Sequence, residues 1–440
     1  MKIGFVSLGC SKNLVDTEVM LKRLADAGYI ITPDETEADI IVVNTCGFIQ
    51  SAKEEAIDNI LDVAWLKKNR ALKGIIATGC LVERYREQVL EEMPEVDAVL
   101  GTGSYHKIVE AVEAVARGEK YASFEDKNAA PLGGERIVTT PPYTAYLKVA
   151  EGCDNRCTYC AIPLIRGRMR SRRMEDVVAE AKSLEKIGVK ELNIIAQDTS
   201  RYGLDLYGKY MLPELVQKIL AETQIPWIRL LYLYPDKITD ELVAVIRDND
   251  RVCKYVDLPI QHVNDTVLAR MNRHGDGAVV RAAVEKIRRE IPGVTLRTTA
   301  IVGFPGETEA QFAELCEFVK ETGFDRFGAF TYSPEEGTPA AEFPDQIDEQ
   351  VKQDRYDTLM AVQLEVSEKK MQEKIGDVIE VLCEGYDPVA GVQYGRSRAD
   401  APDVDGKVYF TSAKKLPEGV FVNVKITKAL DYDLFGEAVR

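Results

Sequence analysis

The sequence predicts an α/β multidomain protein with three parts: an N-terminal open parallel-sheet α/β domain, a central partial (β/α) barrel and a small C-terminal all-β barrel. Three observations support this fold class. The chain of 440 residues is too long for one ordinary domain. Apolar strand-like runs alternate with amphipathic segments in two separate stretches. The last part of the chain, about 65 residues, changes to short alternating strands with glycine turns, as in a small barrel.

The N-terminal domain, predicted for residues 1–120, is indicated by four apolar runs separated by helical stretches. These runs are Ile3–Leu8, Asp39–Val43, Gly74–Ala77 and Ala98–Leu100. Such alternation favours a parallel sheet whose strands are connected by helices. Residues 121–142 follow as a polar connection that contains Pro and Gly, which indicates an interdomain linker.

The central domain, predicted for residues 143–370, shows the same alternation of strand and helix. The expected strands include Ala145–Val149, Glu191–Ala196, Ile228–Leu233, Tyr255–Leu258, Thr295–Val302 and Arg326–Tyr332. Repeated units of this number favour a barrel or partial barrel, whose chemistry collects at the C-terminal ends of the strands. A long charged helix, about Asp348–Lys374, then leads into the C-terminal domain, predicted for residues 371–440.

Composition and charge limit the classes of function. The formal net charge is −16. Nucleic-acid-binding proteins usually show a basic face, so a basic partner suits this chain better, unless the acidity only keeps the protein in solution. No apolar run reaches the roughly 18 residues of a membrane span, and the N-terminal apolar stretch is too short for a signal peptide, so we expect a cytoplasmic protein. Nine cysteines without an export signal favour metal binding or free thiols over disulfides.

Three cysteines, Cys153, Cys157 and Cys160, lie together directly after the strand-like run 143–150. Their spacing lets one loop wrap a single metal centre. Thiolates are the usual ligands of iron–sulfur clusters, and three of them leave one iron of a 4Fe–4S cube open to a substrate. Zinc is the first alternative, but structural zinc takes a fourth protein ligand, and no nearby His or Cys supplies one. Inert core cysteines are the second.

The Cys-x3-Cys-x2-Cys loop, with the aromatic Tyr159 just before its last cysteine, resembles the signature of radical S-adenosylmethionine (SAM) enzymes. The resemblance implies that Cys153, Cys157 and Cys160 hold a 4Fe–4S cluster whose open iron is chelated by SAM. It also implies that an electron from this cluster cleaves SAM to a 5′-deoxyadenosyl radical, which abstracts hydrogen from an unactivated carbon. The cofactor then carries the chemistry, while the protein orients it.

A second set of cysteines is spread through the N-terminal domain. Cys10, Cys46 and Cys80 each follow directly on an apolar strand. The carboxyl ends of parallel strands share one edge of the sheet, where open α/β folds bind ligands. The adjacent glycines, Gly9, Gly47 and Gly79, would let backbone approach a cofactor closely. The alternative is that each cysteine is a small buried hydrophobe, but their shared position favours a second three-cysteine cluster with an open iron.

With two open clusters in one chain, the whole sequence resembles the methylthiotransferases. These are radical SAM enzymes with an N-terminal cluster domain, a radical SAM barrel and a C-terminal TRAM barrel. The resemblance implies that all six cysteines act in catalysis through their clusters, the N-terminal one being associated with the sulfur to be transferred. It implies that SAM both donates a methyl group and generates the radical, so that a methylthio group is inserted. It also implies a low-potential electron donor such as flavodoxin or ferredoxin.

The run Lys12-Asn13-Leu14-Val15-Asp16, two residues after Cys10, resembles the branch that modifies an aspartate of a ribosomal protein. The branch that modifies a tRNA adenosine typically has Gln-Met-Asn there, while Ser11 departs from the Pro most often expected. The resemblance implies ribosomal protein uS12 as substrate, free or on the small ribosomal subunit, and 3-methylthioaspartate as product. The alternative is a tRNA adenosine (N6-isopentenyl or threonylcarbamoyl) 2-methylthiotransferase.

The charge of the C-terminal domain bears on this choice. Residues 371–440 contain nine Lys/Arg and twelve Asp/Glu, a formal charge of −3. A barrel that grips tRNA should be basic, whereas an acidic one suits a basic ribosomal protein. The alternative is an acidic barrel that only packs on the catalytic domain.

Five further residues are predicted to contact SAM. Tyr159 is expected near the adenine, with ordinary core packing as the alternative. Gln197 and Asp198 end a strand and could meet the amino group or ribose, with helix capping as the rival role of Asp198. Gly303 and Gly306 could let backbone contact the adenine, although such a glycine-rich run is often simply a turn.

The remaining chemically interesting residues are left open between two roles. A basic run after the cysteine loop either holds the SAM carboxylate or the target, or is a solvated face; it comprises Arg166, Arg168, Arg170, Arg172 and Arg173. His262 is either catalytic or a satisfied, hydrogen-bonded histidine. Cys253, Cys316 and Cys383 fit no cluster pattern; Cys316 lies on a helical face and is expected in the core, and a redox role is the alternative for any of the three.

Overall fold

The N-terminal part of the chain forms a parallel sheet of six strands, as predicted. The computed structural model describes residues 1–439. The strands are β1 (Lys2–Ser7), β2 (Ile30–Ile31), β3 (Ile40–Thr45), β4 (Gly74–Gly79), β5 (Ala98–Leu100) and β6 (Tyr121–Ser123); the helices are α1 (Ser11–Asp26), α2 (Gln50–Asn69), α3 (Cys80–Tyr85), α4 (Gln88–Glu92) and α5 (Ile108–Ala116). The strand order is β2-β1-β3-β4-β5-β6, so β1, β3 and β4 are neighbours.

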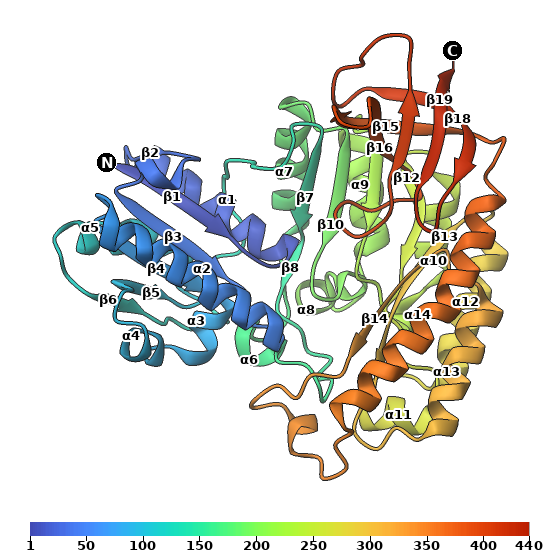
Figure 1. Cartoon of the computed structure of the whole chain (residues 1–440), viewed down its shortest axis with the longest axis horizontal. Helices are drawn as coiled ribbons and strands as arrows, with labels where there is room; N and C mark the ends of the chain where they lie inside the picture. The colour runs from blue at the N-terminus through green and yellow to red at the C-terminus, as the bar shows by residue number, and fades with distance from the viewer. Residues whose placement is uncertain (440) are drawn as a thin grey trace.

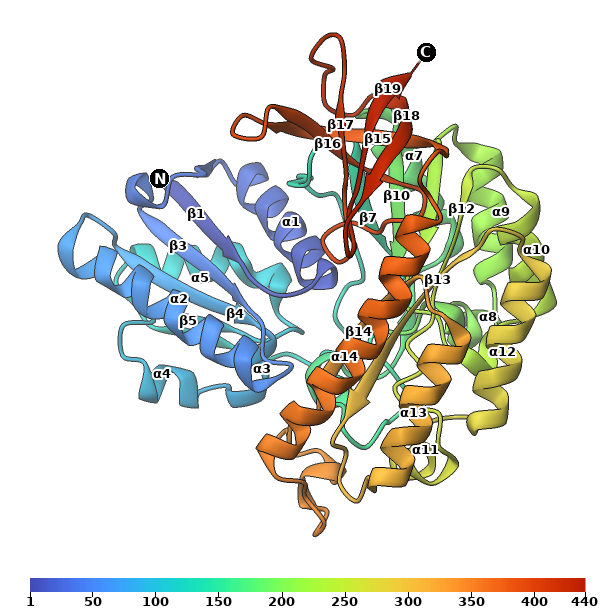
Figure 2. The ribbon, with the colours of Figure 1, turned by 45° about the vertical axis from the view of Figure 1, so that its right-hand side comes forward.

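Helices cover both faces of this sheet, which explains its continuous apolar runs. Along β3, Ile40 and Val42 belong to the core beneath α1 and α5, whereas Ile41 and Val43 belong to the core beneath α2. Successive strand residues point to opposite faces, so a parallel strand covered on both sides is apolar throughout. Figure 2 shows the sheet between α1 and α2.

The connection after this sheet is tied down rather than free. Its first three residues form β6, which pairs with β5, so the sheet extends into the segment predicted as a linker. A strand of three residues is too short to show a readable period. Further on, the buried Arg136 side chain donates to Glu18 of α1, to Glu180 of the central domain and to the carbonyl oxygen of Tyr146.

The central part contains a second parallel sheet that is open at both edges. Its strands are β7 (Thr144–Lys148), β10 (Glu191–Ile195), β11 (Trp227–Leu230), β12 (Val252–Asp257), β13 (Thr295–Val302) and β14 (Arg326–Thr331); its main helices are α7 (Met174–Lys186), α9 (Leu212–Glu222), α10 (Asp240–Asp248), α12 (Gly277–Glu290), α13 (Glu309–Thr322) and α14 (Glu349–Gln372). The order β14-β13-β12-β11-β10-β7 leaves β7 and β14 unpaired with each other, which confirms a partial barrel. Within residues 1–439, no helix combines the length and apolarity that crossing a membrane requires.

One predicted strand of this sheet ends three residues earlier than expected. The run Ile228–Leu233 was expected to be extended, but β11 ends at Leu230. Tyr232 adopts a φ of +63°, which is uncommon for a residue with a side chain and breaks the strand. Apolar composition alone does not reveal such a turn.

The C-terminal domain is a closed five-stranded barrel. Its strands are β15 (Val378–Asp387), β16 (Val392–Ser397), β17 (Val408–Thr411), β18 (Phe421–Ala429) and β19 (Leu434–Val439). Tyr146 and Tyr255, on the inner face of the central sheet, donate to its Asp403 at 2.8 Å and Asp405 at 2.6 Å. The barrel therefore lies toward the amino ends of the central strands (Figure 1), and the carboxyl ends remain for the site.

Part of the acidity of this barrel serves its docking. Asp400 pairs with Arg326 of β14, Asp405 lies 3.7 Å from Arg297 of β13, and Glu380 accepts from the indole N–H of Trp227. Asp400 and Asp405 are buried against the central domain, whereas Glu380 contacts it but stays exposed. Packing on the catalytic domain therefore accounts for part of the acidity. Other carboxylates of the barrel are exposed, among them Glu373, Asp377, Glu418 and Glu437, so a basic partner stays a prediction.

Replacing Glu191 by Ala should weaken the contact between the C-terminal barrel and the central domain. The fully buried Glu191 accepts from Arg229 at 3.0 Å and from Arg396 of the C-terminal barrel at 2.5 Å. Removing one partner of a buried ion pair costs about 3–5 kcal/mol, because the remaining charges stay buried without a partner. Urea unfolding should show this loss. Glu222→Ala, which breaks an exposed pair with Lys182, should change stability by less than about 1 kcal/mol.

The same contact predicts a pH dependence. Burial raises the pKa of Glu191, but Arg396 and Arg229 outweigh it and lower the pKa to about 2. A carboxyl group with a lowered pKa stabilises the fold above its unfolded value, 4.5, and that stability is lost as the pH falls toward 2. The Glu191→Ala protein should lack this part of the acid dependence, and an unchanged acid profile would contradict the assignment.

Candidate functional site

The first three-cysteine set lies at the carboxyl end of the central sheet, as predicted. After β7 the chain forms β8 (Ala150–Glu151), the loop with Cys153, Cys157 and Cys160, and then α6 (Ile162–Arg166). The loop begins at Gly152, whose φ is +79° and whose Cβ would lie 2.1 Å from the carbonyl oxygen of Arg168. Only glycine fits this position, so the turn into the loop depends on it.

These three thiols form a donor set in which Cys157 is buried and Cys153 and Cys160 are partly buried. All are free, and the Cys160 N–H donates to the carbonyl oxygen of Cys157 at 3.0 Å, which folds the end of the loop tightly. Burial raises the pKa of the Cys153 thiol to about 12 and that of Cys160 further. A thiol in such surroundings ionises readily only beside a cationic metal centre. The loop therefore has the donor chemistry of an iron–sulfur site.

The second thiol set lies at the carboxyl ends of the strands of the N-terminal sheet. Cys10, Cys46 and Cys80 follow β1, β3 and β4, three adjacent strands. A Cβ on Gly9 would lie 2.8 Å from the Cβ and 3.0 Å from the Sγ of Cys46, so the loop of Cys10 rests directly on Cys46. Burial raises the pKa of Cys80 to about 12, and the nearby Cys10 and Cys46 thiols add to this rise. The three thiols thus converge from segments 34 or more residues apart.

Glycines make this convergence possible, which gives a testable prediction. Gly79 has φ +100°, and a Cβ there would lie 2.4 Å from the carbonyl oxygen of Thr45. Gly79→Ala should therefore force the Cys46 and Cys80 loops apart and lower the iron bound by this set. Gly28→Ala is the control, because Gly28 also has a positive φ but nothing lies within 4 Å of its Cβ position. Equal iron content in both variants would contradict the steric explanation.

The two thiol sets meet at one short helix. Cys80 packs against Ile165 of α6 and against Ala161, which precedes α6 and directly follows Cys160. The sequence predicted two separate centres but did not indicate that they lie beside the same helix. Within residues 1–439, no three His, Cys, Asp or Glu side chains converge tightly enough to hold a single metal ion.

A buried ionic network joins the two domains at this helix. Arg166 of α6 donates to Asp16 of α1 at 2.5 Å, to Asn13 at 3.0 Å and to Cys80 Sγ at 3.4 Å. Lys148 of β7 pairs with Asp16 and, at 2.7 Å, with Glu151. Burial raises the pKa of Glu151, but Lys148 and Arg166 outweigh it and lower the pKa to about 2.

Sequence reasoning missed Asp16, Lys148 and Glu151 as site residues. Asp16 was noted only as part of a family motif, and the other two lie in or beside the predicted strand. The role of the basic run was left open between two alternatives, and the structure decides between them for three of its five arginines. Arg166 and Arg172 are buried, Arg172 pairing with Glu180, and Arg170 donates to backbone carbonyls, so the solvated-face alternative is wrong for these three.

The residues predicted to contact SAM have different surroundings in the structure. Gln197 donates to Glu151 at 2.6 Å, and its Oε1 is buried without a hydrogen-bond partner among residues 1–439, so it offers a free acceptor. Asp198 accepts from Asn155 at 2.8 Å and from Ser200 at 2.5 Å, and its side chain does not cap the 3-10 turn that follows, so the capping alternative is wrong. Tyr159 packs beside Met271 and Phe304 in an apolar cluster.

Gly303 and Gly306 have positive φ values, which shows that the run is a turn. A Cβ on Gly303 would lie 2.3 Å from Lys352 of α14, and one on Gly306 would lie 2.2 Å from Asp345. These close contacts explain the glycines without a ligand, and an adenine contact stays a prediction.

His262 and the three remaining cysteines are structural. The fully buried His262 accepts from the Asn264 N–H at Nδ1 and contacts Glu307 at 3.1 Å through Nε2, which confirms the satisfied-histidine alternative. Cys253 and Cys383 are fully buried, in two different apolar cores. Cys316 packs against the core of the central domain.

Three family models match successive parts of the chain. The uncharacterized protein family UPF0004 matches residues 2–101, the radical SAM superfamily matches residues 147–319, and the TRAM domain matches residues 375–439.

Curated relatives match the whole chain. The ribosomal protein uS12 methylthiotransferase RimO of Thermoanaerobacter sp. (strain X514) is 50% identical over 436 residues, 99% of either chain. The protein of the same name from Geobacter sulfurreducens is 50% identical over 441 residues, which cover 100% of this chain and 98% of that protein. Among solved structures, the radical SAM methyltransferase TsrM from Kitasatospora setae has a TM-score of 0.56 at 14% identity, covering 77% of this chain and 73% of that one. That likeness concerns the fold alone.

Proposed function

This chain belongs to the family of ribosomal protein uS12 methylthiotransferases, and from that membership we infer that it inserts a methylthio group at the β carbon of an aspartate of uS12, giving 3-methylthioaspartate. It is a radical SAM enzyme with a C-terminal TRAM domain. Family membership implies SAM and a 4Fe–4S cluster as cofactors. The assignment of roles to individual residues is our proposal.

We assign the cluster of the radical SAM domain to Cys153, Cys157 and Cys160. When bound there, the cluster and SAM supply the radical that takes hydrogen from the target carbon, and SAM also supplies the methyl group. The chain contributes the buried loop that presents three thiols and leaves one iron for SAM. We assign the amino group of SAM to the unpartnered Oε1 of Gln197, with Asp198 next to it in the chain.

We assign a second 4Fe–4S cluster to Cys10, Cys46 and Cys80. The support is the convergence of three thiols at the ends of adjacent strands, with a glycine beside each one. Three cysteines again leave one iron without a protein ligand, and that position can hold the sulfur to be transferred. Arg166 orients Cys80 and fixes this set to the radical SAM domain.

The single observation that carries this proposal is the packing of Cys80, from the second thiol set, against Ala161, the residue after Cys160 of the first set. Methylthio insertion must bring sulfur, methyl group and radical to one target carbon. Two neighbouring centres can serve a common space, whereas two distant centres could not. We further propose a cytoplasmic location and a low-potential electron donor such as flavodoxin or ferredoxin, because cleavage of SAM consumes an electron.

An anaerobic assay with purified uS12, SAM, sulfide and reductant tests the proposal. Mass spectrometry should find one methylthio group on one aspartate of uS12. The same measurement on a deletion strain should find unmodified uS12 and unchanged tRNA. Loss of methylthioadenosine from tRNA with uS12 unaltered would overturn the assignment in favour of the tRNA-modifying branch.

A further inference from the structure

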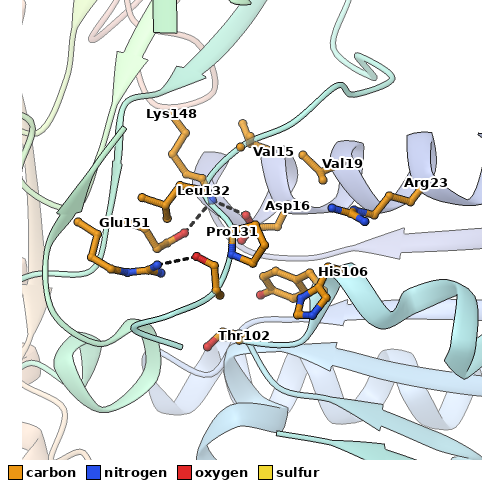
Figure 3. A pocket seen from close by; sticks show the side chains of 15 residues that line it. Val15, Asp16, Val19, Arg23, Thr102, His106, Pro131, Leu132, Lys148 and Glu151 are labelled. Atoms are coloured by element: carbon orange, nitrogen blue, oxygen red, sulfur yellow. Dashed lines mark hydrogen bonds and ion pairs between the residues drawn. The ribbon is translucent and has the colours of Figure 1, made fainter. Parts of the chain in front are cut away.

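A small cavity lies at the junction of the N-terminal and central domains. It is enclosed by α1, by residues 102–106 before α5, by residues 130–133 of the connection and by β8, and its volume is about 50 Å³. Figure 3 shows Asp16 and Lys148, one from each domain, meeting at one wall, with Arg23 farther along α1 and His106 on the opposite side. A cavity needs about 10–15 Å³ to hold one water, so this one accepts a small ion but neither SAM nor a peptide.

The cavity is built for an anion. Its two carboxylates, Asp16 and Glu151, are neutralised by Lys148 and by Arg166 behind the wall. Two other guanidinium groups line it, those of Arg23 and Arg170. Arg170 donates to backbone carbonyls, and neither group forms an ion pair with a carboxylate within residues 1–439. A partly enclosed space with unneutralised positive charge concentrates small anions.

The cavity lies near the second thiol set, with the side chains of Tyr105 and Arg166 between them. Tyr105 lines the cavity, and the Arg166 guanidinium lies 5.9 Å from the centre of its ring. Arg166 in turn donates to Cys80 Sγ at 3.4 Å. The Tyr105 hydroxyl is buried and has no hydrogen-bond partner in the described part of the chain, so it is free to contact a ligand.

We propose that this cavity binds hydrosulfide and is the route by which inorganic sulfur reaches the centre of Cys10, Cys46 and Cys80. The inference rests on the proposed function, because a methylthio group requires a sulfur atom besides the methyl group that SAM donates. Hydrosulfide is a small monovalent anion, which matches both the size and the charge of the cavity.

The first test detects binding without any turnover. Crystals of the full-length, reconstituted protein are soaked in sodium iodide, a monovalent anion with a strong anomalous signal. We expect an iodide peak in the cavity between Arg23 and Arg170, and its loss in Arg23→Gln. A matched control is Lys22→Gln, which removes the neighbouring positive charge from the same helix outside the cavity. An empty cavity in the wild-type crystal, or an equal peak in Arg23→Gln, would overturn the proposal.

The second test is kinetic. Arg23→Gln should raise the apparent KM for sodium hydrosulfide about twofold to fivefold, as expected for one partly exposed charge, with kcat retained. Ala130→Trp, which fills the cavity, should raise it further, and Lys22→Gln should leave it unchanged. With a persulfide-carrying protein as sulfur source, Arg23→Gln should behave as wild type. If Arg23→Gln changes the KM equally for hydrosulfide and for the persulfide carrier, or changes the KM for neither, the proposal is overturned. Absence of product from the wild-type enzyme would instead contradict the proposed function, and the iodide result would still stand.

Discussion

Replacing Cys80 by Ala will abolish formation of methylthioaspartate but leave SAM cleavage in place, whereas replacing Cys157 by Ala will abolish both. The two thiols belong to separate sets, one at the end of the N-terminal sheet and one in the loop after β8. Changes outside the ligand sphere already cost 10- to 100-fold, so loss of a ligand should leave less than about 1% of the dependent activity. Product on uS12 and 5′-deoxyadenosine can be measured in the same anaerobic reaction.

Iron content gives the matching structural result. Each single variant should lose the iron of one cluster and keep that of the other. Cys316→Ala is the control, because this partly buried thiol packs on the central core away from both sets, and it should retain full iron and both activities. Methylthio product from Cys80→Ala, or loss of SAM cleavage in that variant, would contradict the division of labour.

Replacing Asp16 by Ala will destabilise the junction between the N-terminal and central domains. Lys148 and Arg166, with side chains only 6% and 3% exposed, would then share the single carboxylate of Glu151. Breaking a buried network in this way costs about 3–5 kcal/mol, because positive charge is left without a partner. Denaturant unfolding should show this loss, and limited proteolysis should show earlier cleavage in the connection between the domains.

Two further variants make this result specific. Asp26→Ala, on the same helix, breaks only an exposed pair with Lys22 and should change stability by less than about 1 kcal/mol. Asp16→Ala combined with Lys148→Met should be more stable than Asp16→Ala alone, since the unpaired charge is then gone. If the single and double variants are equally unstable, the ionic network is not the cause.

Much of the fold could be predicted from the sequence because its strands are buried on both faces. Ala98–Leu100 and Thr295–Val302 form strands with the predicted bounds. The cysteines were placed correctly at strand ends for the same reason, since a buried strand ends where glycine and polar residues begin. Where a strand ended in an unusual backbone conformation, as at Tyr232, composition gave no warning.

The junction between the domains could not be predicted, because it depends on contacts between distant segments. Asp16 and Arg166 are 150 residues apart, and nothing in either local sequence indicates the other. The charge of the C-terminal barrel could not be interpreted from the sequence for the same reason. Its net charge was counted as if all of it faced a partner, whereas Asp400, Asp403 and Asp405 contact the central domain. Net charge does not say which side of a domain carries it.

The central claim is that the chain holds two clusters, each through three cysteines. Its most direct test is the iron and sulfide content, with Mössbauer spectra, of a variant in which Cys153, Cys157 and Cys160 are all replaced by Ala. After anaerobic reconstitution, the account predicts one intact 4Fe–4S cluster, held by Cys10, Cys46 and Cys80, and no SAM cleavage. A protein that retains no cluster would contradict it.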